Sequence, residues 1–214
     1  MDGNRRWAAE RGLSVLKGHQ YVANEVLEKL IEHAADTGVE YLTLWAWSTE
    51  NWSRSKIEVT GIMKLLRFGF VKFGQRMYEK GIRIKVIGNI SAFPADIQNT
   101  LRGLIEKTKS NTRITVIFAL NYGGRDEIVR AVHLIGTTST ITEEGFSQHL
   151  DTAGTPDPDV VIRTGGEKRL SGFLLWQCQY SELFFTSWHM PDFTPEKLDE
   201  ILDEYAGRIR RFGK

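Results

Sequence analysis

Cysteine, proline and long apolar runs are all scarce in this chain of 214 residues. Its single cysteine, Cys178, excludes an internal disulfide and a zinc cluster, and it fits a reducing compartment. Trp176 and Tyr180 flank it, which favours a buried core position over a reactive one. The longest apolar runs are far shorter than the about 20 residues that span a bilayer. We therefore expect a soluble, cytoplasmic protein without a signal peptide, for which peripheral contact with a membrane stays open.

An excess of charge of one sign is also lacking. Lysine and arginine total 28 against 27 aspartates and glutamates, so the formal net charge is +1. This balance gives no long-range attraction to nucleic acid, so we expect no nucleic-acid partner, and any anion site must be built locally. The length, with 41% hydrophobic and 26% charged residues, is typical of one globular domain spanning 1–214.

Helical and strand periodicities alternate along the chain without a linker or a repeat. This order predicts an α/β fold, with a mostly parallel central β-sheet and helices on both faces. The expected strands are 41–47, 83–87, 113–120, 159–163 and 182–186. The expected helices cover about 22–38, 57–80, a segment opened by Pro94, a segment from Asp126, and 195 to about 211.

Polar loops follow three of the predicted strands, at 48–54, 121–125 and 163–171. Ligands of open parallel sheets bind beyond the carboxyl ends of the strands, so we expect these loops to meet at one rim. The Gly-Gly-Arg turn at 123–125 alone is more often a simple helix entry, capped near Asp126. The joint placement of the three loops favours a binding site.

The loop after the fourth predicted strand is typical of a site for phosphate esters. Arg163 and Arg169 flank a Gly-Gly turn, with the hydroxyl groups of Thr164 and Ser171 on either side. Guanidinium groups, free backbone N–H groups and hydroxyls can converge there on one polyanion. Glu167 in the same loop would repel the anion unless it orients a cation such as Mg²⁺ or forms an internal salt bridge.

Further motifs stand in a fixed order along the chain. They are Asp-Gly-Asn-X-Arg-Trp-Ala at 2–8, Gly-His at 18–19, Ser-Thr-Glu-Asn-Trp-X-Arg at 48–54, Asn-Tyr-Gly-Gly-Arg at 121–125, Arg-Thr-Gly-Gly-Glu-X-Arg-X-Ser at 163–171, Tyr-Ser-Glu-Leu-Phe-Phe at 180–185 and a basic run at 208–213. With these motifs the chain resembles the cis-prenyltransferases of the undecaprenyl diphosphate synthase family over nearly its whole length.

The resemblance implies condensation of isopentenyl diphosphate with an allylic diphosphate, such as farnesyl or geranyl diphosphate. The reaction forms a Z double bond and releases diphosphate. The resemblance also implies Mg²⁺ and a homodimer. An allylic diphosphate ionises when a divalent cation and N–H donors stabilise the departing oxygens, and the motifs offer such groups.

Two alternatives stay open. A non-catalytic or impaired subunit of a cis-prenyltransferase complex would typically lose the Asp and Arg motifs, which this chain keeps. A nucleotide or sugar-phosphate binding domain would be expected to carry a Gly-x-Gly-x-x-Gly or P-loop motif, and neither is present.

The resemblance also implies roles for individual residues. Asp2 and Asn51 are the expected catalytic residues, Asp2 as a metal ligand and Asn51 near the reacting carbons in a loop anchored by Glu58. Glu182 is the expected second metal ligand, contributed across the dimer interface, and its alternative is an ion pair with an arginine such as one from the terminal basic run. The residues expected to bind substrate are Gly3, Asn4, Arg5, Arg6, Trp7, His19, Ser48, Trp52, Arg54, Arg163, Arg169 and Ser171.

Within this set Arg6 and His19 are expected to hold the allylic diphosphate, and Arg163, Arg169 and Ser171 the isopentenyl diphosphate. For Trp52 plain packing is the alternative, and for Trp47 packing is the preferred interpretation.

Three features depart from the family pattern. Met1 directly precedes Asp2, so the family's first strand is apparently missing; we expect exposed apolar surface and Asp2 on a fraying end. Val15 stands where many relatives have an arginine that binds diphosphate, and nearby Lys17 is only a point charge. Arg5 replaces a common glycine and partly compensates.

The helix expected at 57–80 has a stripe with two glycines. Gly61, Leu65, Phe68, Gly69 and Phe73 recur at spacings that place them near one face. A glycine inside a helix costs about 0.5–1 kcal/mol relative to alanine, so two on one stripe suggest that space is kept free. The space serves either close packing on the sheet or, as the resemblance implies, a tunnel for the growing product.

Overall fold

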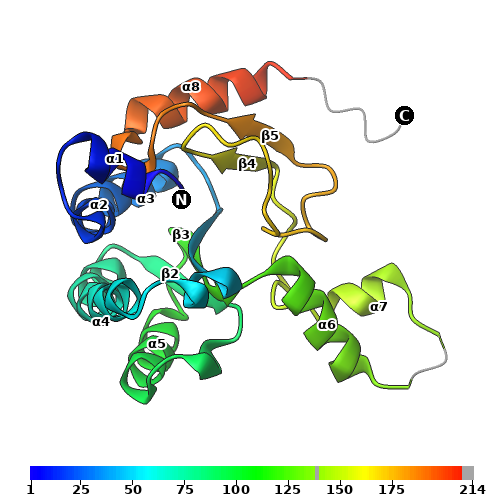
Figure 1. Ribbon diagram of the computed structural model, residues 1–214. Helices are drawn as coiled ribbons and strands as arrows, with labels where there is room; N and C mark the ends of the chain where they lie inside the picture. Colours follow the sequence, from blue (N-terminus) through cyan, green and yellow to red (C-terminus); the bar gives the residue numbers. More distant parts are fainter. Residues whose placement is uncertain (138–139, 209–214) are drawn as a thin grey trace.

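The computed structural model describes residues 1–137 and 140–208, where helices alternate with parallel strands (Figure 1). The strands are β1 (Tyr41–Ser48), β2 (Ile82–Ile87), β3 (Ile114–Tyr122), β4 (Val160–Arg163) and β5 (Glu182–Phe185). The helices are α1 (Asn4–Glu10), α2 (Val15–Tyr21), α3 (Leu27–Asp36), α4 (Lys56–Glu79), α5 (Ala95–Thr108), α6 (Gly124–Ile135), α7 (Glu143–Ser147) and α8 (Pro195–Ala206).

Every predicted strand and helix is present, with small shifts of its ends. The helix expected from Asp126 already begins at Gly124, and a π-helical turn (Val22–Val26) joins α2 to α3. The last helix ends at Ala206. Most of the terminal basic run, 209–213, lies outside the described residues.

All strand pairs are parallel, as predicted, but they form two hydrogen-bonded sheets. One sheet has the order β1-β3-β2 and the other pairs β4 with β5. In the first sheet, Ile82 of β2 lies opposite Ile114 of β3. In the second sheet, Val160 of β4 lies opposite Glu182 of β5. Backbone bonds do not join β1 to β4, and both strands line a cavity that lies between them.

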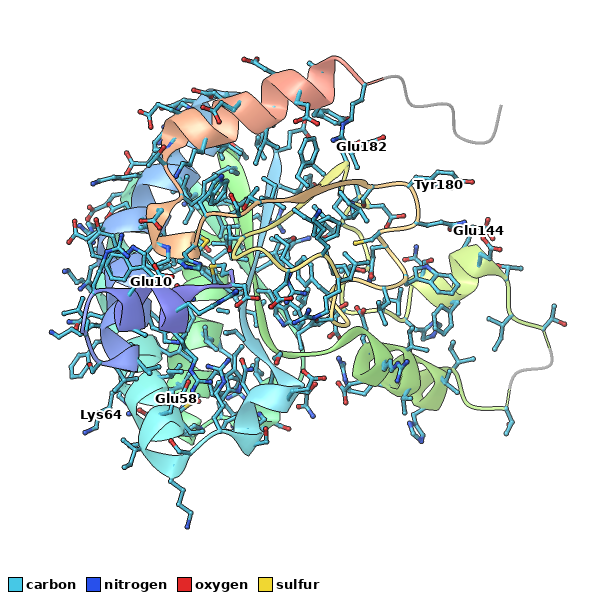
Figure 2. All side chains as sticks on the ribbon, turned by 45° about the horizontal axis from the view of Figure 1, so that its top comes forward. Glu10, Glu58, Lys64, Glu144, Tyr180 and Glu182 are labelled. Carbon is cyan, nitrogen blue, oxygen red and sulfur yellow. The ribbon has the colours of Figure 1, made fainter. Side chains whose placement is uncertain are left out.

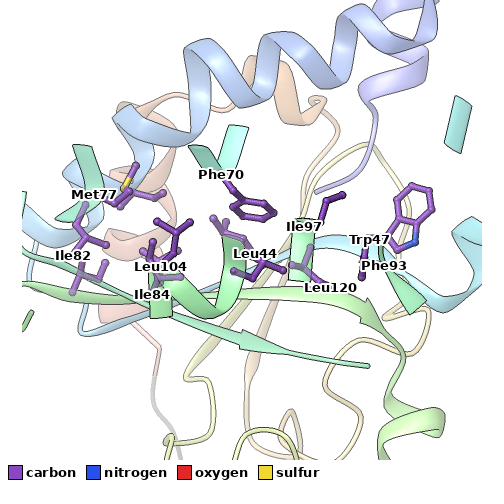
Figure 3. Close-up of a cluster of buried hydrophobic side chains, with 14 of the residues drawn as sticks. Leu44, Trp47, Phe70, Met77, Ile82, Ile84, Phe93, Ile97, Leu104 and Leu120 are labelled. Atoms are coloured by element: carbon purple, nitrogen blue, oxygen red, sulfur yellow. The ribbon is translucent and has the colours of Figure 1, made fainter. Parts of the chain in front are cut away.

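One face of the three-stranded sheet packs against α4 and α5. Figure 3 shows side chains such as Leu44, Phe70, Ile84, Leu104 and Leu120 meeting in this cluster. Such close apolar packing is the main stabilising contribution to the fold.

The opposite face is covered by the turn-rich segment 170–178, not by a helix. The predicted α/β fold, with a mostly parallel sheet and helices, is confirmed, and the long connection between β4 and β5 returns over this second face. Cys178 packs there, buried as predicted, and burial raises the pKa of its thiol to about 11.

Among the described helices, none combines the length and the apolar character needed to cross a membrane. The polar loops that follow β1, β3 and β4 lie at the carboxyl ends of these strands. Trp52 Nε1–H of the first loop donates to Asn121 Oδ1 of the second (2.7 Å), and Gly124 N–H of the second donates to the carbonyl of Gly172, the residue directly after the third loop (2.7 Å). The expected common rim is therefore confirmed.

Candidate active site

The first residues of the chain are tied to the end of β4. The Asp2 N–H donates to Thr164 Oγ1 (2.9 Å), the Thr164 hydroxyl donates to the Asp2 carbonyl (2.7 Å), and the Met190 N–H donates to the same carbonyl (2.9 Å). Gly3 lies at φ 95°, where a Cβ would come within 2.5 Å of His189 Nδ1. The expectation that Asp2 sits on a fraying end is wrong, because these contacts fix its position.

Arg163, the last residue of β4, connects three parts of the site. Its guanidinium donates to Asp2 Oδ2 (3.0 Å), to Ser171 Oγ (2.7 Å) and to the Arg169 carbonyl. Burial alone would raise the pKa of Asp2, but hydrogen bonds from Arg163 and the Gly3 N–H, with the charges of Arg163 and Arg6, hold it below its ordinary value. Asp2 is therefore a carboxylate at neutral pH.

Glu167 links two other arginines of the candidate site. Its carboxylate forms an ion pair with Arg169 and lies 3.9 Å from Arg6 Nη1, and Arg6 Nη2 also lies 3.8 Å from Asp2 Oδ1. Of the two roles considered for Glu167, the structure has the internal salt bridge. The arginines are thus held near one another by carboxylates that an incoming diphosphate can replace.

A polar pocket of about 400 Å³ brings together most of the predicted anion-binding residues. Four arginines contribute to its lining, and a pocket of this kind suits a diphosphate. The lining residues are Met1, Asp2, Gly3, Asn4, Arg5, Arg6, His19, Arg54, Glu167 and Arg169.

Two buried polar atoms of this pocket have no partner among the described residues. They are Nε2 of His19 and Oδ1 of Asn4. Burial, with the nearby positive charge of Arg54, lowers the pKa of His19 to about 4. His19 is therefore neutral at pH 7 and has a ring nitrogen available to a ligand.

Arg5 and Arg54 share the carboxylate of Glu58. Arg54 Nη1 lies 3.0 Å from Glu58 Oε1 and Arg5 Nε lies 3.8 Å from it, so Glu58 anchors both arginines at the pocket. Val15 begins α2 and does not line the pocket, whereas Arg5 does. Arg5 of α1 therefore places a guanidinium at the pocket, whereas position 15 contributes no side chain to its lining.

The loop after β1 is ordered by its own contacts. The Ser48 N–H donates to Asn51 Oδ1 (3.1 Å), and residues 49–53 form a 3₁₀-helix. Trp52 packs between Trp47 and Phe93, with ring centroids 5.2 and 5.5 Å away. Trp47 is a buried packing residue as preferred, and Trp52 takes the same role here, outside both cavities. Ser48 and Asn51 line the larger cavity described next.

A second, mostly apolar cavity of about 1080 Å³ continues from the polar pocket. Both cavities share Asp2, Asn4, His19, Arg54 and Arg169 in their linings. From this shared mouth, the larger cavity extends between α4, β1 and β4 to residues near the start of β1. The arrangement can hold a molecule with an anionic head and a long hydrocarbon tail.

The glycine stripe of α4 divides between the two explanations offered for it. No atom lies within 4 Å of the Cβ position of Gly69, which lines the cavity with Leu65 and Phe73. A Cβ on Gly61 would instead lie 2.4 Å from Leu16 Cδ1, so Gly61 serves close packing. Phe68 is 71% exposed on the other side of the helix, so its placement on the cavity stripe was wrong.

Two predicted residues lie apart from the pocket in a single chain. The buried Trp7 donates from Nε1 to Asp192 Oδ1 (2.8 Å) and lines neither cavity.

Glu182 begins β5, whereas Asp2 lies beside Arg163 at the far end of the β4–β5 pair. Figure 2 shows Glu182 near the C-terminal end of α8. Glu182 forms an ion pair with Arg208 (2.6 Å), the alternative raised for it. Within the described residues, no group of three acidic, histidine or cysteine side chains could hold a metal ion.

Reasoning from the sequence missed a buried polar network behind the rim. Glu127 accepts hydrogen bonds from the Tyr122 hydroxyl (2.6 Å), Gln177 Nε2 (3.1 Å) and the Asp151 N–H (3.0 Å). Burial raises the pKa of Glu127. The network fixes the end of β3 against segment 170–178. It was not predictable from the sequence, because a glutamate in the first turn of a helix is common and does not indicate buried partners.

A family model described as putative undecaprenyl diphosphate synthase matches residues 1–213. The chain is 45% identical to the (2E,6E)-farnesyl-diphosphate-specific ditrans,polycis-undecaprenyl-diphosphate synthase of Micrococcus luteus, covering 100% of this chain and 88% of that protein. It is 43% identical to an isoprenyl transferase of Aquifex aeolicus, covering 100% and 93%.

Two solved structures are similar over most of their length. The lavandulyl diphosphate synthase of Lavandula x intermedia, in complex with dimethylallyl diphosphate, has a TM-score of 0.94 at 35% identity and covers 100% of this chain and 95% of its own. A probable undecaprenyl diphosphate synthase of Campylobacter jejuni has a TM-score of 0.83 at 35% identity, covering 92% and 93%.

Proposed function

Because the chain belongs to the undecaprenyl diphosphate synthase family of cis-prenyltransferases, we propose that it condenses isopentenyl diphosphate with an allylic diphosphate into a polyprenyl diphosphate. The observation that carries this proposal is the joined pair of cavities. An arginine-lined pocket of about 400 Å³ suits the diphosphate, and the apolar cavity of about 1080 Å³ suits the growing hydrocarbon.

The two substrates would use different arginines of the site. Arg6 and His19 would hold the allylic diphosphate in the polar pocket, and Arg163, Arg169 and Ser171 would hold isopentenyl diphosphate at the end of β4. The allylic C1–O bond breaks, and diphosphate leaves with the electron pair. C1 bonds to the terminal alkene carbon of isopentenyl diphosphate, which then loses a proton to form the Z double bond. N–H donors fixed beside the leaving oxygens favour the first step.

We propose Mg²⁺ as the cofactor of this reaction. A carboxylate that stays ionised at the polar pocket is the kind of hard oxygen ligand that Mg²⁺ takes, and Asp2 is such a group. The bound ion would supply positive charge to the leaving diphosphate. Glu182 would complete the site only from a second copy of the chain, since the two residues stand at opposite ends of the β4–β5 pair.

A homodimer is proposed for the same reason. Val129 and Val132 on α6, 55% and 53% exposed, offer apolar surface for a partner. If Asp2 and Glu182 meet across the interface, a mixture of inactive Asp2→Asn and Glu182→Gln proteins should regain part of the activity, because exchange of subunits restores one intact site. Light scattering should show a dimer. Failure to complement after verified exchange of subunits would argue that each site is complete within one chain.

The proposed reaction is tested by incorporation of radiolabelled isopentenyl diphosphate with farnesyl or geranyl diphosphate, with Mg²⁺ and with EDTA. Label in a polyprenyl product that depends on Mg²⁺ supports the proposal, and chromatography gives the primer preference and the product length. Absence of product from the isolated, folded dimer would favour the non-catalytic subunit.

The buried Cys178 supports a location in the reducing cytoplasm.

A further inference from the structure

Helix α4 carries apolar residues on both of its faces. Leu65 and Phe73 line the cavity on the inner face. On the outer face Ile57, Phe68 and Val71 are 82%, 71% and 65% exposed. A surface helix of a globular protein is normally polar on its solvent side, so an apolar outer face indicates a further contact.

The outer residues fall on one stripe of the helix. Successive members are separated by three, four or seven positions, so their side chains project in similar directions. Figure 2 shows Lys64 projecting away from the body of the molecule, on the side of α4 opposite the core. We call this stripe the outer face of α4; it consists of Ile57, Lys64, Phe68, Val71, Gln75 and Tyr78, with Lys72 at its margin.

The charge of this helix has a single sign along most of its length. Residues 59–78 contain four basic side chains and no acidic one. Arg67 pairs with Asp96, and Arg76 Nη2 lies 3.0 Å from Glu28 Oε2. In the described part of the chain, Lys64 and Lys72 have no carboxylate partner, although the protein as a whole is almost neutral. Two uncompensated lysines therefore flank Phe68 and Val71.

We propose that the outer face of α4 docks on the surface of an anionic lipid bilayer. Exposed aromatic and aliphatic side chains flanked by lysines match the boundary between acyl chains and anionic headgroups. A second copy of the chain fits this face less well, because a two-fold axis through it would bring the unpaired lysines of both copies together. α4 lies on the side of the molecule away from α6 and α7, so a bilayer can reach it while α6 is covered (Figure 1).

This location would connect the apolar cavity to the membrane. The inner face of α4 borders the cavity, and the outer face would border lipid, so one helix separates the proposed product from a hydrocarbon phase. Only this link to product release rests on the proposed function. The docking itself rests on the exposure and the charge of α4, and it can be measured without catalysis.

The test is sedimentation of the purified full chain with phosphatidylcholine vesicles, with and without about 30% phosphatidylglycerol. We expect binding to the anionic vesicles that weakens at high salt, since exposed charges are screened. Lys64→Gln and Lys72→Gln should each lower the partition coefficient about fivefold. The double variant Phe68→Ser/Val71→Ser should lower it about tenfold or more.

Matched controls keep the result interpretable. Ile141→Ser removes an exposed apolar side chain (51%) away from α4, and Lys29→Gln removes an exposed lysine of α3; both should bind as the wild type does. The Phe68→Ser/Val71→Ser protein should keep its thermal transition and its condensation activity in detergent. Equal binding of all variants to anionic vesicles, or no binding by the wild type, overturns the proposal. So does a lower oligomeric state of this double variant, which would identify the face as an interface between copies. Loss of condensation by the wild type would count against the proposed function alone.

Discussion

Acidification is expected to destabilise this protein through His19. Burial lowers the pKa of this imidazole from 6.5 to about 4 in the folded state, so the folded protein keeps it neutral where the unfolded chain is already protonated. The free energy of unfolding should therefore be insensitive to His19 above pH 6.5. It should fall as the pH drops from 6.5 toward 4, and below pH 4 the stability that depends on the neutral imidazole is fully lost.

The magnitude follows from the size of the shift. Each pKa unit corresponds to about 1.4 kcal/mol, so a fall from 6.5 to about 4 amounts to about 3 kcal/mol. His19→Gln cannot titrate, and the difference in unfolding free energy between wild type and variant should shrink by about this amount from pH 7 to pH 4. Urea unfolding followed by tryptophan fluorescence at several pH values measures it.

Two further observations bear on the same reasoning. Inorganic diphosphate bound beside His19 should raise its pKa, so its presence should reduce the loss of stability between pH 6.5 and 4. A constant difference between the wild type and His19→Gln across this range would refute the reasoning, as would an NMR titration of the His19 ring near pH 6.5.

Other substitutions test the remaining parts of the site. Asp2→Asn keeps an acceptor for the Gly3 N–H but loses the charge, so turnover should fall at least about 100-fold at unchanged melting temperature; full turnover in EDTA would contradict the role of Asp2. Arg169→Ala should raise the KM for isopentenyl diphosphate about tenfold or more, with less effect on the allylic substrate, and the reverse pattern would mean that the two sites are exchanged. Gly69→Leu should shorten the product by one or more isoprene units. Gly103→Leu should not, because Gly103 has equally open surroundings but lies outside the cavity. Equal product lengths for both variants would show that Gly69 does not limit the length of the product. Glu127→Leu should cost about 3 kcal/mol or more in chemical denaturation because three donors lose their acceptor, and Glu127→Gln should cost less.

The elements of the fold could be predicted because each carries a local signal. A nearly continuous apolar run rich in β-branched residues marks β3, and Gly81 and Gly88 follow a helix and a strand. The division into two sheets has no such signal, because it depends on which strands come close enough to pair. The cover of the second face was missed for the same reason, since segment 170–178 lacks helical periodicity and reaches the sheet only through tertiary contacts.

The anion-binding residues were predictable as a group, but their pairing was not. Charge and spacing identified Arg163 and Arg169, since guanidinium groups around glycine turns are typical of phosphate sites, and the family resemblance added Arg6. That Glu167 would join two of these arginines depends on a contact between the two ends of the chain. The two hydrogen bonds between Asp2 and Thr164 also join residues far apart in the sequence. They were not predicted, because the position of Asp2 next to the first residue suggested only a frayed end.

The unequal bonding of the strands has a consequence for amide hydrogen exchange. β3 is bonded on both sides, so its amides should exchange only on global unfolding. The β4–β5 pair has no backbone bond to β1 and should open locally at lower free energy. Arg163 lies on this pair, so a ligand that engages it would slow exchange in β4 and leave β3 unchanged. The part of the molecule most responsive to isopentenyl diphosphate would then be its least protected pair of strands.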